Sequence, residues 1–116
     1  MQVLSDLIKF QTIEGKERDI GMREEVIDKL GNVIYLTDER WQHIVSKHSK
    51  VRGCRKEVLS TVRSGKRRQD KWFLDKFYYT KKFLMPQGRI KEIEVVVVFR
   101  WKMNKPNNFI LTAYQL

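Results

Sequence analysis

Two histidines, His43 and His48, lie five positions apart in one short segment, and the chain of 116 residues has no others. Histidine ordinarily titrates near neutral pH, which suits it to giving and taking protons. The surrounding chain is strongly basic, with 24 Lys+Arg against 14 Asp+Glu and a formal net charge of +10, and such a surface attracts phosphate groups. These residues predict proton transfer at a phosphate, with the two imidazoles as base and acid in either order.

The spacing of the histidines leaves other interpretations open. Positions five apart are separated by about 140° around a helix, so both side chains reach one site only if the helix ends before His48. A hydrogen-bonded core position for His48 and a surface position for His43 form the structural alternative. A two-histidine metal site is disfavoured, because the spacing does not suit ligands on adjacent turns and no carboxylate cluster follows. We expect no metal or other cofactor.

Charge is unevenly distributed along the chain. Residues 1–31 hold five basic and seven acidic side chains, whereas residues 47–71 hold ten basic and two acidic ones. We therefore divide the chain into an N-terminal extension over 1–31, with a short helix and no assigned role, and one domain over 32–116. The basic stretch predicts a surface for RNA or DNA, and a solvated face that only gives solubility is the alternative.

The sequence also carries information on compartment. Cys54 is the only cysteine, which excludes an intramolecular disulfide and is typical of a reducing environment. The longest apolar run, Val95–Phe99, is too short to span a bilayer, and the first residues do not resemble a signal peptide. We expect a cytoplasmic protein with no membrane partner.

Hydrophobic periodicity predicts three helices. The first covers residues 22–30, the second is capped by Thr37 or Asp38 and runs to about Lys47 or His48, and the third covers roughly residues 53–64. Gly31 and Gly65 follow the first and third of them, as glycine often follows a helix. The expected buried faces of the second and third helices are Trp41, Ile44, Val45 and His48, and Cys54, Val58, Leu59 and Val62.

Apolar and aromatic runs predict strands over residues 33–36, 72–74, 76–83, 92–101 and 109–114. In the fourth of these, the face expected to pack under the helices holds Ile93, Val95, Val97, Phe99 and Trp101. The opposite face of that strand holds Glu92, Glu94, Val96, Val98 and Arg100. Helices followed by strands predict an α+β fold.

The last expected strand helps to locate a site. Alternation places Ile110, Thr112 and Tyr114 on one face, and Phe109, Leu111 and Ala113 on the other. If the second set packs against the helices, Thr112 and Tyr114 join Arg100 on an open face, together with Tyr79 or Lys81. Arginine binds phosphate oxygens and aromatic rings stack on unpaired bases, so this face predicts RNA binding. Each of these residues taken singly is more commonly structural.

Several motifs occur in a recognisable order. The segment Leu-Thr-Asp-Glu-Arg-Trp-x-His-Ile-x-x-x-His is followed by Tyr-Tyr-x-Lys-Lys, a valine-rich strand and a terminal Ile-Leu-Thr-Ala-Tyr. This order resembles the phage barnase-type branch of the barnase, EndoU, colicin and RelE nuclease superfamily over about residues 32–116. The Thr-Ala-Tyr triplet is also similar to the Thr/Ser-x-Tyr motif that EndoU-type nucleases carry beside two histidines and a lysine. The glutamate base of barnase has no clear counterpart in this sequence.

The resemblance implies an α+β fold with N-terminal helices packed on one face of a four- or five-stranded antiparallel sheet. It also implies a metal-independent endoribonuclease, often a toxin, that cleaves RNA through attack of the 2′-hydroxyl to give a 2′,3′-cyclic phosphate. An acidic antitoxin or immunity protein is then an expected partner besides RNA. The expected catalytic residues are His43, His48, Arg100, Thr112 and Tyr114, and the expected substrate-binding residues are Arg52, Tyr79, Lys81 and Lys82. A non-enzymatic RNA- or DNA-binding module and an inactive phage-related protein of the same fold are the alternatives.

Overall fold

The computed structural model describes residues 23–116, which fold into one six-stranded sheet, two α-helices and a small hairpin. The elements of the sheet are β1 (Arg23–Ile27), β2 (Val33–Thr37), β3 (Lys66–Gln69), β4 (Lys76–Leu84), β5 (Ile90–Val98) and β8 (Asn108–Gln115). The remaining elements are α2 (Asp38–Lys47), the short 3₁₀ helix η1 (Ser49–Val51), α3 (Arg55–Ser64), β6 (Trp101–Lys102) and β7 (Lys105–Pro106).

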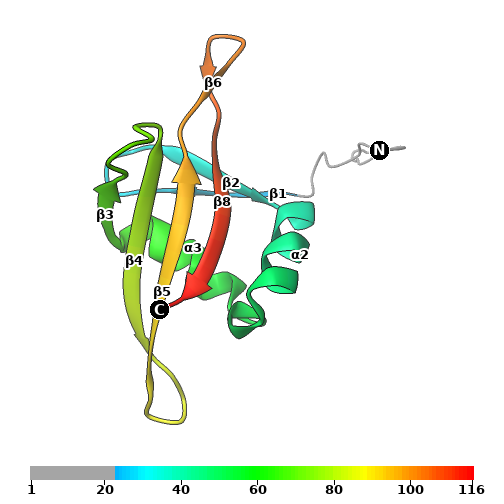
Figure 1. The fold of residues 1–116 in the computed structure, drawn as a ribbon, viewed down its shortest axis with the longest axis vertical. Coiled ribbons are helices and arrows are strands. Elements are labelled where there is room, and N and C mark those ends of the chain that lie inside the picture. The colour runs from blue at the N-terminus through cyan, green and yellow to red at the C-terminus, as the bar shows by residue number, and fades with distance from the viewer. Residues whose placement is uncertain (1–22) are drawn as a thin grey trace.

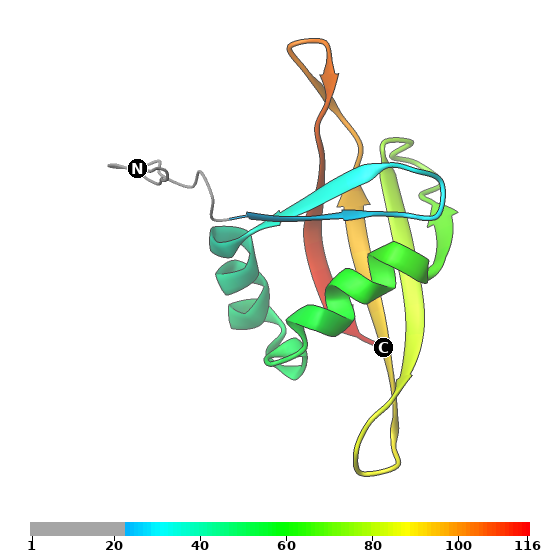
Figure 2. The ribbon, with the colours of Figure 1, turned by 180° about the vertical axis from the view of Figure 1, so that it is seen from behind.

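The strands lie in the order β1-β2-β8-β5-β4-β3, and every neighbouring pair is antiparallel except β2 and β8, which run parallel. Helix α3 covers one face of this sheet, behind the strands in Figure 1 and in front of them in Figure 2. Helix α2 lies beside β8 and contacts it. The sheet face turned away from α3, called the open face below, is turned toward the viewer in Figure 1.

Helix α2 forms where its cap and its periodicity predict it. Thr37 is the N-cap, and its Oγ1 accepts a hydrogen bond of 3.0 Å from the backbone N–H of Arg40. The helix ends at Lys47 with His48 as its C-cap, and Trp41, Ile44 and Val45 are buried as expected. His48, expected on the same buried face, is half-buried. Among residues 23–116, no helix has the length and apolar character needed to cross a membrane.

Helix α3 packs directly against the sheet. Its buried residues include Val58, Leu59 and Val62, which confirms the predicted apolar face. Gly65 is the C-cap of the helix, and a Cβ there would lie 2.4 Å from the backbone oxygen of Thr61 and 2.8 Å from that of Thr80. The chain therefore passes closely between α3 and β4 at a point where only glycine fits.

The core lies between α3 and the helix-facing side of the sheet. Ile93, Val95 and Val97 of β5 are each fully buried there, which confirms the predicted inward face of the valine-rich strand. Trp101 was expected on the same face but is 74% exposed. Strand β5 ends at Val98, and the chain then enters the β6–β7 hairpin, whose turn residues Met103 and Asn104 have φ angles of 52° and 63°.

The helix expected over residues 22–30 is wrong for the described part of that range. Residues 23–27 form β1, which pairs with β2, and only Val26 of this strand is buried. The following turn is closed by the Asp28 carboxylate, which accepts hydrogen bonds from the backbone N–H groups of Leu30 and Asn32. The expected division after residue 31 thus falls within a hairpin, and residues 1–22 of the extension lie outside the described residues.

The α+β class is confirmed, but the arrangement differs from the expected one. The helices lie between β2 and β3 in the chain rather than before the strands, and the sheet is mixed with six strands rather than antiparallel with four or five. Residues 72–74 are an exposed loop, not a strand. Strand β3 was missed because Lys-Arg-Arg-Gln has no apolar alternation, and it forms by pairing with β4 at the sheet edge.

A β-bulge changes the expected faces of the last strand. The register passes from Val96 opposite Thr112 to Val97 opposite Ile110, so one residue of β8 is skipped. As a result, Ile110 and Ala113 both point into the core, and Phe109 shares the open face with Thr112 and Tyr114. Simple alternation had placed Ile110 on the open face and Phe109 on the face toward the helices.

Candidate active site on the open face of the sheet

A buried carboxylate lies near the middle of the open face. Glu94 of β5 is 6% exposed, and its Oε1 accepts a hydrogen bond of 2.7 Å from the hydroxyl of Tyr114. Its Oε2 accepts bonds from Thr80 Oγ1 at 3.2 Å and from Arg68 Nη2 at 3.3 Å. These donors offset the cost of burying the charge. A carboxylate has about four acceptor sites, so the three donors found within residues 23–116 leave one site for a further partner.

The register of the sheet explains why these groups meet. Glu94 is opposite Thr80 on one side and Tyr114 on the other, and residues directly opposite each other in antiparallel strands share a face. The next pairs along the sheet place Thr112 opposite Val96 on the same face. Four strands of different sequence positions therefore build one cluster, which we call the Glu94 cluster: Arg68, Thr80, Glu94 and Tyr114.

His48 extends this cluster toward α2. It is the C-cap of the helix, where its backbone N–H donates a 2.8 Å hydrogen bond to the oxygen of Ile44. Its imidazole lies against the Tyr114 ring, with 5.6 Å between the ring centroids and 56° between their planes. One tyrosine side chain thus touches an imidazole with its ring and a carboxylate with its hydroxyl.

The environment of Tyr114 fixes its hydroxyl as a donor. Burial raises the pKa of this phenol, and the hydrogen bond and negative charge of Glu94 raise it further. The phenol therefore stays protonated at neutral pH and holds Glu94 Oε1 in place.

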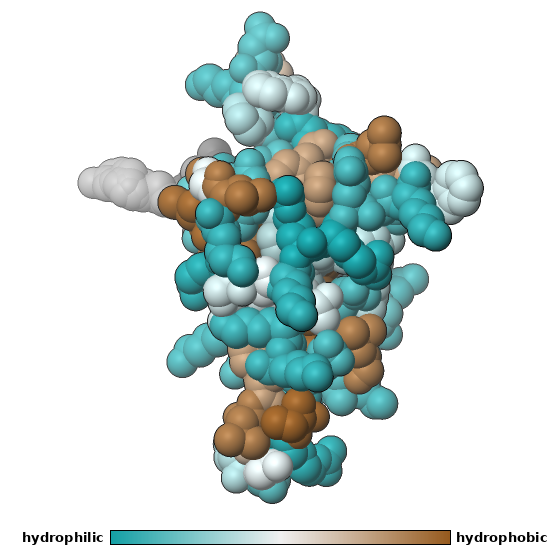
Figure 3. Space-filling view, turned by 90° about the vertical axis from the view of Figure 1, so that its left-hand side faces the viewer, coloured by the Kyte–Doolittle hydropathy of each residue, from teal (hydrophilic) through white to brown (hydrophobic). Residues whose placement is uncertain are grey.

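On the other side of the cluster, Arg68 is held at the sheet edge. Its guanidinium lies 4.2 Å from the centroid of the Tyr78 ring, whose hydroxyl donates to Asp70 at 2.8 Å. Hydrogen bonds from the backbone N–H groups of Phe73 and Trp72, and then from Tyr78, lower the pKa of Asp70 to about 2. The Arg68 side chain is 63% exposed, so it can reach a ligand as well as Glu94. This edge faces the viewer in Figure 3, where hydrophilic residues cover its middle.

Two further expected site residues lie on the open face. Thr112 is half-buried and precedes Tyr114 by two positions on β8. Lys82 of β4 is exposed and stands opposite Glu92. It lines a hollow of about 330 Å³ at the sheet edge, whose lining also includes Lys66, Thr80, Lys81 and Ser64 at the end of α3. Thr112 and Lys82 both flank the Glu94 cluster.

Tyr79 and Lys81 are on the other side of the sheet, so neither joins Thr112 and Tyr114 as expected. Tyr79 is 1% exposed and its hydroxyl donates to Asp28 at 2.6 Å. Lys81 Nζ donates to two serine hydroxyls of α3, at 2.9 and 2.7 Å. The alternation of β4 places Tyr78, Thr80 and Lys82 on the open face instead.

Arg100, Arg52 and His43 lie away from the Glu94 cluster. Arg100 is near the start of β8, 5.9 Å from the centroid of the Phe109 ring, and its Nε is 3.6 Å from an Asp75 carboxylate oxygen. Arg52 is exposed just after η1. His43 is on the exposed side of α2, where it lines a hollow with Thr37, Glu39 and Arg40, so the two histidines are not brought together.

Three members of the Glu94 cluster were not assigned by sequence reasoning: Glu94, Thr80 and Arg68. A signal for Glu94 is present in the sequence. Four valines follow it, so both faces of the strand are apolar beyond this point, and a glutamate buried beside them must be hydrogen-bonded. No comparable signal exists for Arg68, because it is one of three consecutive basic residues and its strand was not predicted.

The described residues offer no ready-made metal site, since no group of three or more His, Cys, Asp or Glu side chains is placed to hold an ion within 23–116. Comparisons with protein-family models, with curated proteins and with solved structures gave no match to this chain.

Proposed function

We propose that this protein is an endoribonuclease that needs no metal and that cleaves RNA at the Glu94 cluster with the help of His48. The observation that carries the proposal is the position of Tyr114 between an imidazole and a carboxylate, two groups that can give or take a proton. Its ring contacts the His48 imidazole, with 5.6 Å between centroids, and its hydroxyl binds Glu94 Oε1 at 2.7 Å. An acid and a base on the two sides of one residue suit cleavage of a phosphodiester between them.

In the proposed reaction, Glu94 is the base. Its free acceptor site takes the proton of a ribose 2′-hydroxyl, and the 2′-oxygen attacks the adjacent phosphorus. The bond from phosphorus to the 5′-oxygen breaks, and protonated His48 gives its proton to that leaving oxygen. The products are a 2′,3′-cyclic phosphate and a 5′-hydroxyl. This assignment uses only one of the two histidines, and a direct role for His43 stays a prediction.

The charge that develops on the phosphate requires nearby donors. Arg68 is 63% exposed at the edge of the cluster, and arginine can hold two phosphate oxygens at once. Lys82 and the hydroxyl of Thr112 lie on the same face and add further donors. Such fixed donors stabilise the transition state more than the ground state.

The overall charge supports a polyanionic substrate. The chain has a formal net charge of +10, and all four residues of the edge strand β3 are exposed, three of them basic. Contacts with RNA phosphates there would release counterions, so binding should weaken steeply with salt. Arg52, just after η1, and Arg100, near the start of β8, stay predicted contacts for the RNA on either side of the cleaved bond.

The test is cleavage of an end-labelled single-stranded RNA in EDTA by the wild type and by Glu94→Gln and His48→Asn. We expect fragments that end in a cyclic phosphate, and a loss of about 10²- to 10⁴-fold in kcat for each variant. Glu92→Gln is the matched control, two residues away on the same strand and face, and should cleave like the wild type. If the wild type binds RNA but leaves it intact, the protein is a binding module and the proposal is wrong.

A further inference from the structure

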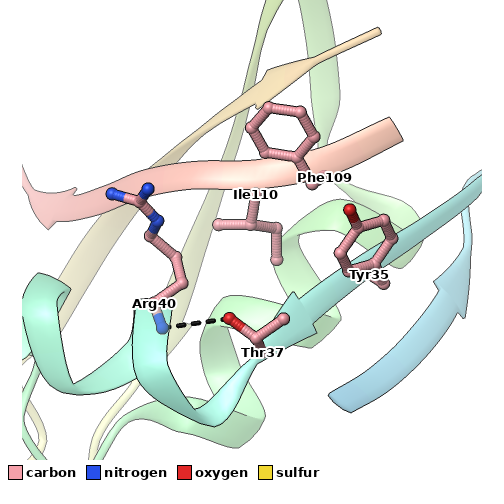
Figure 4. Close-up of a pocket in the computed structure, with 5 residues that line it drawn as sticks. All are labelled: Tyr35, Thr37, Arg40, Phe109 and Ile110. Atoms are coloured by element: carbon pink, nitrogen blue, oxygen red, sulfur yellow. Dashed lines mark hydrogen bonds between the residues drawn. The ribbon is translucent and has the colours of Figure 1, made fainter. Parts of the chain in front are cut away.

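A second hollow lies at the other end of β8 from the Glu94 cluster (Figure 4). It has a volume of about 210 Å³ and is formed where β2 ends, α2 begins and β8 begins. We call it the aromatic hollow, and its lining residues are Tyr35, Thr37, Arg40, Phe109 and Ile110. Pockets for drug-sized ligands measure about 300–1,000 Å³, so this one suits a single small ring system.

Two aromatic rings give the aromatic hollow its character. Tyr35 and Phe109 are half-buried neighbours, with 6.1 Å between centroids and a 43° tilt, so part of each ring reaches solvent. The Tyr35 hydroxyl donates to Asn107 Oδ1 at 3.1 Å, which fixes the position of that ring. Ile110, only 1% exposed, lies below Phe109 and to the left of Tyr35 in the view of Figure 4. The result is a preformed apolar surface of the kind on which bases stack.

Cations surround these rings. The Arg23 guanidinium lies 4.2 Å from the Tyr35 centroid, and that of Arg100 lies 5.9 Å from the Phe109 centroid. Arg23 is paired with Glu25 and Arg100 with Asp75. The Arg40 side chain lines the hollow, and no carboxylate within residues 23–116 forms an ion pair with it. Arg40 is therefore the cation that a bound anion would engage first.

A neighbouring hollow continues along α2. It measures about 270 Å³, shares Thr37 and Arg40 with the aromatic hollow, and adds Glu39 and His43. From Phe109 to Tyr114, β8 extends at most about 17 Å, and a stacked nucleotide occupies about 3.4 Å. A strand of RNA can thus place one base in the aromatic hollow while another nucleotide, a few positions away, meets Glu94.

We propose that the aromatic hollow is a subsite for an unpaired base of single-stranded RNA, with the phosphate of that nucleotide bound by Arg40. The base stacks on Phe109, and because every base has a stacking face, the subsite has little base preference. This inference rests on the proposed function, since it assigns a subsite to the same substrate. In this arrangement, the first two turns of α2, including His43, contact the RNA away from the cleaved bond.

The experiment measures binding of a fluorescent 2′-O-methyl RNA decamer, which has no free 2′-hydroxyl to attack the phosphate. Phe109→Leu keeps apolar volume but removes the ring, and we expect its Kd to rise about tenfold, as for the loss of one stacked base. Arg40→Gln should also weaken binding, and Phe109→Tyr should bind like the wild type because it restores the ring. Phe83→Leu, a half-buried phenylalanine on the helix side of β4, is the control and should leave Kd unchanged.

The outcomes for this subsite and for catalysis are separable. If Phe109→Leu and Arg40→Gln bind the decamer as tightly as the wild type while RNA is still cleaved, the subsite is wrong and the proposed function stands. If these variants bind weakly but wild-type protein leaves ordinary RNA intact, the subsite stands and the proposed function fails. Equal weakening by Phe83→Leu would contradict the subsite, because the effect would then come from general loss of packing.

Discussion

Tyr114→Phe removes one hydroxyl and leaves the ring that contacts His48. That hydroxyl is the donor to Glu94 Oε1 at 2.7 Å, and Glu94 is only 6% exposed, so its loss leaves a largely buried carboxylate with two of its three donors. The substitution therefore isolates the bond that holds the proposed base. Tyr35→Phe is a matched control, because Tyr35 is another half-buried strand tyrosine whose hydroxyl binds a neutral amide, that of Asn107, at 3.1 Å.

The two substitutions should differ in size. A hydrogen bond to a charged group contributes about 1.5–3 kcal/mol to stability, against about 1 kcal/mol for a neutral pair. For a domain of this size, each kcal/mol shifts Tm by about 4–8 °C. We therefore expect Tyr114→Phe to lower the free energy of unfolding by about 2 kcal/mol and Tm by about 10 °C. Tyr35→Phe should lower Tm by about 5 °C.

Thermal unfolding followed by circular dichroism at neutral pH and fixed salt checks this expectation. If Tyr114→Phe melts within a degree or two of the wild type, or no lower than Tyr35→Phe, the Glu94 carboxylate is not held by Tyr114 as described. The geometric basis of the proposed base would then be lost, whatever RNA cleavage showed.

Three other predictions concern the fold and the open face. Burial acts to raise the pKa of Asp28, but hydrogen bonds from Tyr79 and the β1–β2 turn outweigh it and lower that pKa. The Asp28 carboxylate therefore stabilises the fold fully above about pH 4, and this stabilisation is lost as the pH falls below that value. In urea unfolding, the free energy of unfolding should fall less between pH 7 and pH 3 for Asp28→Asn than for the wild type. Gly65→Ala should cost about 2 kcal/mol in urea unfolding, because its Cβ would meet backbone oxygens of α3 and β4. Lys82→Gln should make the negative slope of log K against log salt for RNA binding shallower by about 0.7. Lys81→Gln, which alters a lysine bonded to α3, should leave this slope unchanged.

Local patterns predicted the elements whose causes are local. Residues 38–47 form a helix because Thr37 caps it and its apolar side chains recur at helical spacing. The inward face of β5 follows from alternation along one strand. Residues 23–27 also carry a spacing compatible with a helix, but pairing with β2 and the turn closed by Asp28 make them a strand. That outcome depends on contacts that a periodicity argument does not contain.

The site was predicted in part for the same reason. Thr112 and Tyr114 were expected together on the open face and lie there, although the bulge at residues 110–112 exchanged the places of Ile110 and Phe109. The hydrogen-bond partners of Glu94 could not be inferred, because its three donors come from three other strands and one of those, β3, gives no apolar signal. Side chains assembled by register become visible only when the strand order is known.

The most direct test of the account is the mass of the RNA fragments that purified protein releases in the presence of EDTA. We predict fragments ending in a 2′,3′-cyclic phosphate from the wild type, and their loss with Glu94→Gln while Glu92→Gln still produces them. Uncut RNA, fragments that carry 5′-phosphates, or full activity in Glu94→Gln would contradict the account.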